Sequence, residues 1–216
     1  GWLDYRAALV DKPVIDPDYL PAEPDASFRP DLGLGVTPMQ GLRFGLAYTQ
    51  GPYLSEQLNT YLPVASNWKD FDQQLWAVEF HFSRGYMEFN SEVVWARYDI
   101  PLQDSAMDVV DYFAELKYTF TPRIYSALRL QRNQYPYIAA NRYTGVSAEN
   151  VTVESLEIGL AYRFSADTQI KFSYLADNWS IKYAPDDYYP SGRSLALQLS
   201  HHFDVKSWFE ETGRTD

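Results

Sequence analysis

Apolar and polar residues alternate with a period of two along most of this 216-residue chain. In residues 110–120, for example, Tyr112 and Leu116 share one face with other apolar side chains, while Asp111 and Lys117 lie on the opposite face. Successive side chains of a β-strand point to opposite faces of a sheet, so this period is typical of strands. The sequence lacks the sustained 3.6-residue period of an amphipathic helix. We therefore expect an all-β fold.

Composition excludes several other classes of protein. The chain has a formal net charge of −11, which argues against a nucleic-acid partner because the phosphate backbone would repel it. Aromatic residues make up 17% of the sequence, too many for a disordered acidic chain. There is no cysteine, so neither a disulfide scaffold nor a thiolate metal site is possible. Apolar runs near the ~18 residues of a membrane-spanning helix are also missing.

The alternation predicts about ten strands. Each of them is long enough, at nine residues or more, to supply the ~9–11 residues that a tilted strand needs to cross a membrane. Their expected ranges are 2–10, 28–37, 41–54, 73–83, 86–99, 109–120, 123–134, 151–164, 169–181 and 193–204. With an even number of antiparallel strands, the N-terminus and the C-terminus lie at the same end of the strands.

The connections between these strands are of two kinds. Four are short, with the sequences TPMQ, SRG, TPR and SADT, and Pro or Gly in three of them sets the dihedral angles of a tight turn. The connections that alternate with them are longer and more polar, at 11–27, 56–70, 101–107, 134–150 and 183–192. Short turns on one side and long loops on the other are typical of bacterial outer-membrane barrels.

The distribution of side chains between the two faces favours the same fold. The apolar faces carry aromatic residues near strand ends, as in the girdles of a lipid-facing band, and the polar faces suit a wet lumen. We expect a transmembrane antiparallel up-and-down β-barrel. The alternatives are a soluble sandwich or lipocalin-like sheet, and a β-propeller, which the spacing of the short turns would allow but which needs four short strands per repeat rather than two long ones.

Three stretches, SRGYMEFNSEVVWARYDIP, ELKYTFTPRIYSALRLQR and LQLSHHF, resemble the strand–turn–strand units of Gram-negative porin-like outer-membrane proteins. The resemblance is one of pattern, covers most of residues 28–204 and does not fix a subfamily. It implies that Phe203 supplies the aromatic residue with which the last strand of such barrels commonly ends. Thirteen residues follow Phe203, so the alternative is that Trp208 and Phe209 extend the last strand.

The resemblance implies a location in the bacterial outer membrane, with the long loops extracellular and the short turns and both chain ends periplasmic. Residues 1–204 would form the barrel and residues 205–216 a periplasmic tail. Porin-like channels usually have sixteen or more strands, so two alternatives stay open: a complete barrel of about ten strands, or the C-terminal part of a larger barrel. Expected partners are outer-membrane lipid and lipopolysaccharide, small hydrophilic solutes, and either further copies in a homotrimer or a partner protein in an envelope complex.

The expected function is passive diffusion of small hydrophilic solutes or ions, and the alternative is a non-conducting scaffold or partner subunit. Alternation places fourteen charged side chains on the inner face, Asp4 and Glu79 among them. Two interpretations stay open for these residues, cross-strand charge ladders that hold the wall or rings that set ion preference. The predicted pore-lining residues are Arg6, Arg43, Glu88, Glu92, Asp111, Glu115, Lys117, Arg129, Glu157, Arg163, Lys171 and Asp177.

Catalysis and metal binding are not expected. The three histidines, His81, His201 and His202, all fall near the turn end of their strands, so none reaches the outer rim to act as a base. The sequence contains no HExxH motif and no EF-hand loop, and no cofactor is expected. The long loops 11–27 and 56–70 are either solvated caps or aromatic-bearing segments that fold inward, because they carry residues such as Tyr61 and Trp68.

Overall fold

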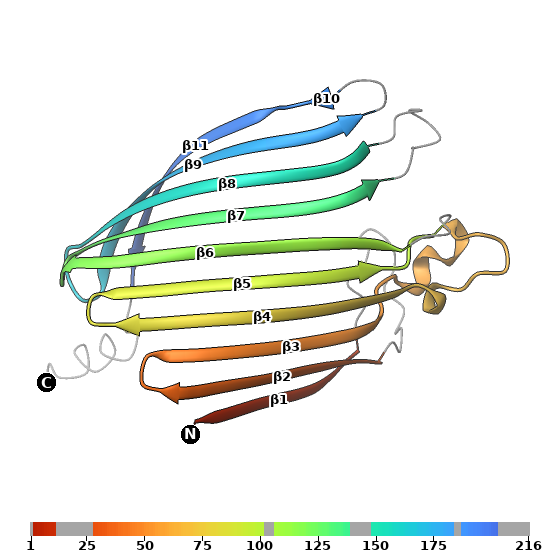
Figure 1. The fold of residues 1–216 in the computed structure, drawn as a ribbon, viewed down its shortest axis with the longest axis horizontal. Helices are drawn as coiled ribbons and strands as arrows, with labels where there is room; N and C mark the ends of the chain where they lie inside the picture. The colour runs from red at the N-terminus through yellow and green to blue at the C-terminus, as the bar shows by residue number, and fades with distance from the viewer. Residues whose placement is uncertain (1, 12–27, 102–105, 139–147, 184–186, 203–216) are drawn as a thin grey trace, which may run out of the picture.

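The computed structural model describes residues 2–11, 28–101, 106–138, 148–183 and 187–202. Within these ranges the strands form one sheet in which neighbours along the chain pair in antiparallel fashion (Figure 1). The strands are β1 (Leu3–Asp11), β2 (Phe28–Met39), β3 (Leu42–Pro52), β4 (Asp72–Arg84), β5 (Met87–Tyr98), β6 (Met107–Thr121), β7 (Ile124–Ile138), β8 (Ala148–Arg163), β9 (Thr168–Tyr183), β10 (Asp187–Tyr188) and β11 (Ser191–His201).

The short strand β10 and the strand β11 both pair with β9 and follow one another along its length. The ladder is interrupted at Tyr189 and Pro190, where proline has no N–H to donate, although the Pro190 carbonyl accepts a hydrogen bond of 2.9 Å from the Trp179 amide. Counted as one interrupted strand, they complete a ten-strand up-and-down meander. The predicted number and order of strands are confirmed.

Strands β6 to β9 are longer than expected, with 15 or 16 residues each. The additional residues lie mainly at the ends that lead into the long connections, where Tyr137 pairs with Glu149 and Ile138 with Ala148. Backbone pairing continues there although the apolar alternation has ended. The hydrophobic pattern therefore marks only part of each strand.

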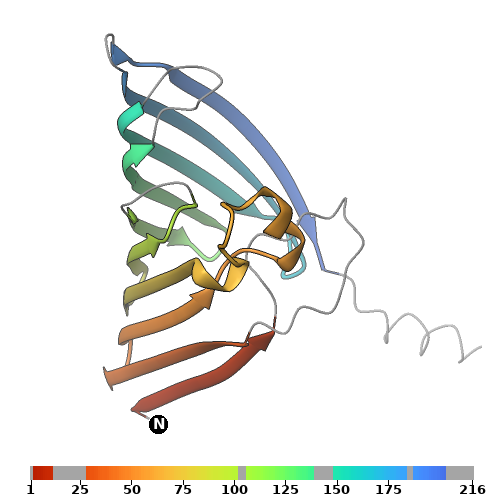
Figure 2. The ribbon, with the colours of Figure 1, turned by 90° about the vertical axis from the view of Figure 1, so that its right-hand side faces the viewer.

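The sheet is curved and open (Figure 2). The sequence predicted a closed barrel, but β1 and β11 lie at the two edges of the sheet and do not pair with one another. Side-chain alternation is the same in an open and in a closed sheet, so the pattern that identified the strands carries no information on closure. The prediction of an all-β antiparallel meander is confirmed, and the closed barrel is not observed.

The short connections are tight turns, as predicted. Gly41 has φ = +82°, and a side chain there would place a Cβ 2.0 Å from the carbonyl oxygen of Ser83, near the end of β4. Gly41 accepts in return a hydrogen bond of 2.6 Å from the Ser83 amide. Glycine is therefore required at this position both by its backbone conformation and by the close approach of the next hairpin.

The connection between β3 and β4 is the long one that the structure describes most fully. It contains two 3₁₀ helices, η1 (Glu56–Tyr61) and η2 (Trp68–Asp70). Viewed along the strands, this segment lies on the concave side of the sheet (Figure 2). None of the described helices is long and apolar enough to cross a membrane.

Candidate functional site

The two faces of the sheet differ sharply in chemistry. On the convex face, large apolar side chains are exposed across the whole width of the sheet, from Leu34 on β2, which is 47% exposed, to Leu197 on β11, which is 71% exposed. Leu116, in the middle of β6, is 40% exposed. These residues do not pack into a common core, as they would in a soluble sandwich. The face that the sequence predicted to be apolar is thus an open surface.

The strand register places all twelve predicted pore-lining residues on the opposite, concave face. One row across the sheet runs from Asp4 through Glu79 and Glu92 to Asp177, and the neighbouring row contains Glu115, Arg129 and Glu157. Glycine and alanine separate many of the charged positions and are buried, as at Ala77 and Ala161. The structure therefore brings the predicted charged residues to one surface, and whether that surface lines a pore stays a prediction.

An ion-pair network occupies the first strands of this concave face. The Arg43 guanidinium donates from Nη2 to Asp4 at 3.1 Å and from Nη1 to Glu79 at 3.0 Å. It bridges two strands because Gly35 and Gly45 leave room beneath it: a Cβ at Gly35 would lie 2.5 Å from Arg43 Nη2. Arg43 thereby neutralises acidic groups on β1 and β4 at once. The charge-ladder interpretation holds here.

A second ion pair joins β5 and β6. The Lys117 ammonium donates to both carboxylate oxygens of Glu88, at 3.0 and 3.1 Å. The same ammonium lies 5.1 Å from the centre of the Tyr125 ring, within the range of a cation–π contact. Lys117 and Glu88 are direct cross-strand neighbours, so this pair is a ladder rung of the kind expected from the sequence.

Arg129 behaves differently, although it stands directly between Glu115 and Glu157 in the register. Its Nη2 donates to Gln131 Oε1 at 3.2 Å, and its guanidinium carbon lies 4.0 Å from the centre of the Phe113 ring. Arg129 therefore points along its own strand toward Phe113 rather than across to either glutamate. Both carboxylates are left without the ion pair that the register alone would suggest.

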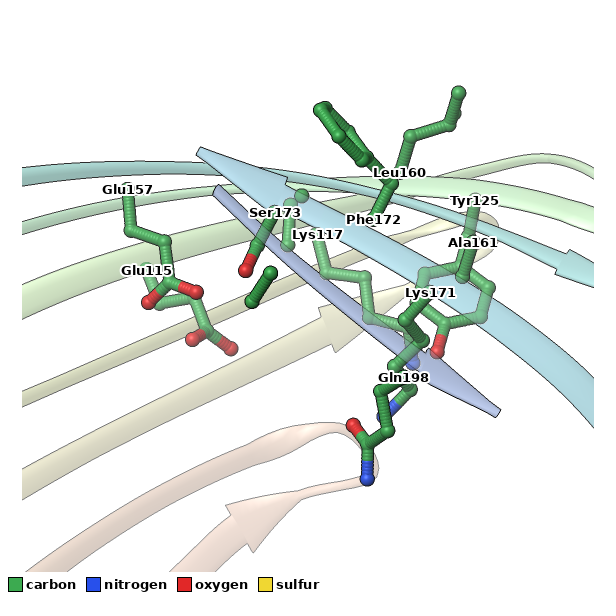
Figure 3. A pocket seen from close by; sticks show the side chains of 13 residues that line it. Glu115, Lys117, Tyr125, Glu157, Leu160, Ala161, Lys171, Phe172, Ser173 and Gln198 are labelled. Atoms are coloured by element: carbon green, nitrogen blue, oxygen red, sulfur yellow. The ribbon is translucent and has the colours of Figure 1, made fainter. Parts of the chain in front are cut away.

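Below these glutamates lies a hollow of about 440 Å³ on the concave face, which we call the lysine–glutamate pocket. Its polar lining consists of Glu115, Lys117, Tyr125, Glu157, Lys171, Ser173 and Gln198. Figure 3 shows Glu115 and Glu157 toward one end of the pocket, with Lys171, Tyr125 and Gln198 toward the other. Leu160 and Phe172 point away to the opposite side of the sheet, in keeping with the alternation.

The segment between β3 and β4 has a small apolar core of its own. Tyr53, Leu54 and Trp68 are buried together, and Trp68 is only 3% exposed. The Tyr53 hydroxyl donates to the Asp99 carbonyl at 2.9 Å, which ties the segment to the end of β5. Burial, with smaller contributions from Asp99 and Tyr98, raises the pKa of Tyr53 to about 12. The segment is therefore a folded element on the concave side rather than a solvated cap.

Several polar residues of this face were missed by the sequence analysis because they carry no charge. Asn133 donates to Asp111 at 3.1 Å, Gln131 links Arg129 to Asn133, and Gln198 lines the lysine–glutamate pocket. They occupy the same alternating positions as the charged residues. Had uncharged polar residues been counted, the period-two pattern would have identified them.

His81 and His201 lie near the short turns and contact polar neighbours, which does not favour a catalytic role. His81 is paired with Asn90, and His201 Nδ1 lies 2.7 Å from the Thr168 hydroxyl, both near the short turns. Among the residues that the structure describes, no group of three or more His, Cys, Asp or Glu side chains is arranged to hold a metal ion. That the chain is not an enzyme stays a prediction. The tail at 205–216 and the loop at 12–27 fall outside the described residues.

Comparison of the chain with protein-family models and with curated proteins finds no match in either case. The resemblance to porin-like proteins is therefore not supported by a family assignment.

Proposed function

We propose that this chain forms the wall of a porin-like channel in the bacterial outer membrane, through which small hydrophilic solutes or ions diffuse passively. One observation carries the proposal, namely that the exposed apolar side chains lie on the convex face and most charged side chains of the strands on the concave face. Arg132 and Glu154 are charged residues on the convex face, and they pair with one another at 3.5 Å. An apolar surface of this extent is costly in water but suits contact with lipid. A wet lumen provides the matching environment for the charged face.

A membrane location requires every backbone N–H and C=O in the hydrocarbon region to be paired. The edges β1 and β11 do not meet that requirement in the open sheet. The proposal therefore includes closure, in one of two ways: β1 pairs with β11 in a ten-stranded barrel, or further strands complete a barrel of sixteen or more. In either arrangement the short turns would be periplasmic and the long connections extracellular, in contact with lipopolysaccharide.

Conduction across a planar lipid bilayer tests the channel function. The purified, folded chain should produce discrete, ohmic steps of ion current in a salt solution. Folding can be checked independently from the strand content by circular dichroism and from altered migration of the unheated protein in an SDS gel. Folded protein that inserts but gives no current would remove the channel function.

Contact with lipid can be tested apart from conduction. Trp76 lies on the convex face and is 39% exposed, whereas Trp68 is buried in the segment between β3 and β4. In single-tryptophan variants, brominated lipids should quench the fluorescence of Trp76 strongly and that of Trp68 weakly, because bromine quenches only at contact distance. Equal quenching of the two would contradict the proposed orientation of the sheet.

A second candidate function is a non-conducting barrel that acts as a scaffold or partner subunit in an envelope complex. The folded segment at 53–71 favours it, because this segment lies on the concave side, where it would narrow an enclosed space. A narrow lumen filled with paired charges would pass few ions. Lipid quenching of Trp76 together with the absence of current would identify this alternative.

A further inference from the structure

The lysine–glutamate pocket separates negative and positive side chains more sharply than the rest of the concave face. At two other places on this face, acidic and basic groups meet directly, in the contacts of Arg43 and Lys117. In the pocket, Glu115 and Glu157 lie toward one end and Lys171 toward the other (Figure 3). The pocket therefore has an acidic end and a basic end with open space between them.

The acidic end has no cationic partner within the described ranges. Neither Glu115 nor Glu157 forms a salt bridge with any lysine, arginine or histidine of those ranges. Arg129 could have served both carboxylates, but it turns to Gln131 and Phe113. Two carboxylates that face one hollow without a counter-charge favour an external cationic group such as an ammonium.

The basic end has an available cation as well. Lys117 is already held by Glu88, but in the part of the chain that is described Lys171 forms no salt bridge. Beside Lys171, the Gln198 amide provides further hydrogen-bond donors, whereas the Tyr125 hydroxyl already donates to Gln169 Oε1 at 3.4 Å. An ammonium with an amide donor beside it suits a carboxylate group.

The row between the two ends of the pocket contains mostly small residues, together with Lys117, whose ammonium is held by Glu88. Ala127 and Gly159 lie in the row between those of Glu157 and Lys171, and Ala161 lies in the row of Lys171 itself. The row of Glu157 and the row of Lys171 are four residues apart along β8 and β9, which corresponds to about 13 Å between their backbones. The glutamate and lysine side chains extend into this interval. A tripeptide, which spans about 10 Å when extended, matches it better than a single amino acid does.

We propose that the lysine–glutamate pocket binds zwitterionic solutes of the short-peptide class, with the ammonium group at Glu115 and Glu157 and the carboxylate at Lys171. The inference deepens the proposed function, because it names the class of solute that the concave face would select. A simple anion would be repelled from the acidic end, and a simple cation from the basic end. Only a solute with both charges at this spacing satisfies both ends at once.

Calorimetric titration of the full chain, folded in lipid nanodiscs, tests the proposal with three peptides of equal length. Triglycine carries both charges, N-acetyltriglycine only the carboxylate, and triglycinamide only the ammonium. Triglycine should bind about tenfold more tightly than either blocked peptide, since each lost charge-assisted hydrogen bond costs at least that much. Equal affinities for the three peptides, or no binding of triglycine, would overturn the proposal without any variant.

Paired variants then locate the site. The double change Glu115→Gln and Glu157→Gln should abolish the preference for triglycine over N-acetyltriglycine, and Lys171→Gln the preference over triglycinamide. Matched controls are Glu154→Gln and Lys182→Gln, on the same two strands but outside the pocket, and they should retain both preferences. Preferences that persist in the pocket variants would contradict the assignment.

The result is distinguishable from failure of the channel function. Calorimetry requires only a folded chain, whereas conduction is measured across a bilayer. Selective binding of triglycine without ion current would support the proposed binding site and contradict the channel function. Ion current with equal affinities for the three peptides would support the channel function and contradict the binding site.

Discussion

The two faces of this sheet are built on the same backbone, yet their side chains meet opposite conditions. On the convex face, Leu116 and its neighbours are exposed and make few polar contacts. On the concave face, charged groups are partly covered and are held by one another, as in the contacts of Arg43 with Asp4 and Glu79. Adjacent residues of one strand are thus suited to different surroundings, the apolar residue to lipid and the charged residue to water. The same introduced residue should therefore lower the free energy of unfolding by different amounts on the two faces.

The largest difference is expected for a new charge in the middle of the apolar face. Leu116→Arg should lower the free energy of unfolding in lipid vesicles by about 2–4 kcal/mol, because an arginine facing hydrocarbon near the bilayer centre must be desolvated. Ser155→Arg, on the concave face opposite Asp177, should change it by no more than about 0.5 kcal/mol. Urea titrations of vesicle-folded protein measure both values. Equal costs would remove the distinction between the faces.

A smaller effect is expected where the segment between β3 and β4 is attached on the concave side. Tyr53→Phe keeps the ring beside Tyr98 but removes the hydrogen bond to the Asp99 carbonyl, at a cost of about 1 kcal/mol to local stability. Amides of residues 53–71 should then exchange with deuterium faster. Tyr61→Phe is the matched control, because Tyr61 is 71% exposed, and it should leave exchange unchanged.

The same tyrosine predicts an alkaline transition confined to this segment. Because the pKa of Tyr53 is raised from 10.0 to about 12, its contribution to stability is complete below pH 10 and is lost as the pH rises through 12. Fluorescence anisotropy of a variant whose only tryptophan is Trp68 should fall across that interval. The transition should be absent when Tyr53→Phe is added, and its persistence would assign it to another group.

The smallest effect is expected for the Arg43 network, because all three of its side chains are at least 36% exposed. Arg43→Gln should lower the free energy of unfolding by no more than about 1 kcal/mol. The difference from the parent chain should shrink further at high salt, which screens exposed charges. A cost that is large and independent of salt would mean that the concave face is shielded from solvent.

Most of the fold follows from one pattern in the sequence. The period-two alternation located all ten strands of the meander and assigned residues such as Leu160 and Glu157 to opposite faces, because the pleat of a strand imposes that assignment. Three of the four tight turns were marked by Pro or Gly. The pattern also selected the charged residues of the concave face without knowledge of how they pair.

The remaining features depend on contacts that no local pattern encodes. The burial of Tyr53 beside Trp68 joins residues fifteen positions apart in a segment without periodicity, so the sequence left open whether it folds inward. Register suggested that Arg129 would pair with Glu115 or Glu157, but the Phe113 ring and Gln131 hold it instead. Openness of the sheet is likewise a property of its edges and not of any single strand.

The direction of the two edge strands has a consequence for any assembled form. In an antiparallel meander with ten members, β1 and β11 run in opposite senses, so they can join one another without creating a parallel ladder. If other strands intervene and keep the antiparallel rule, they must come in pairs. Any closed, fully antiparallel barrel that contains this sheet must therefore have an even number of strands, whatever supplies the additional ones.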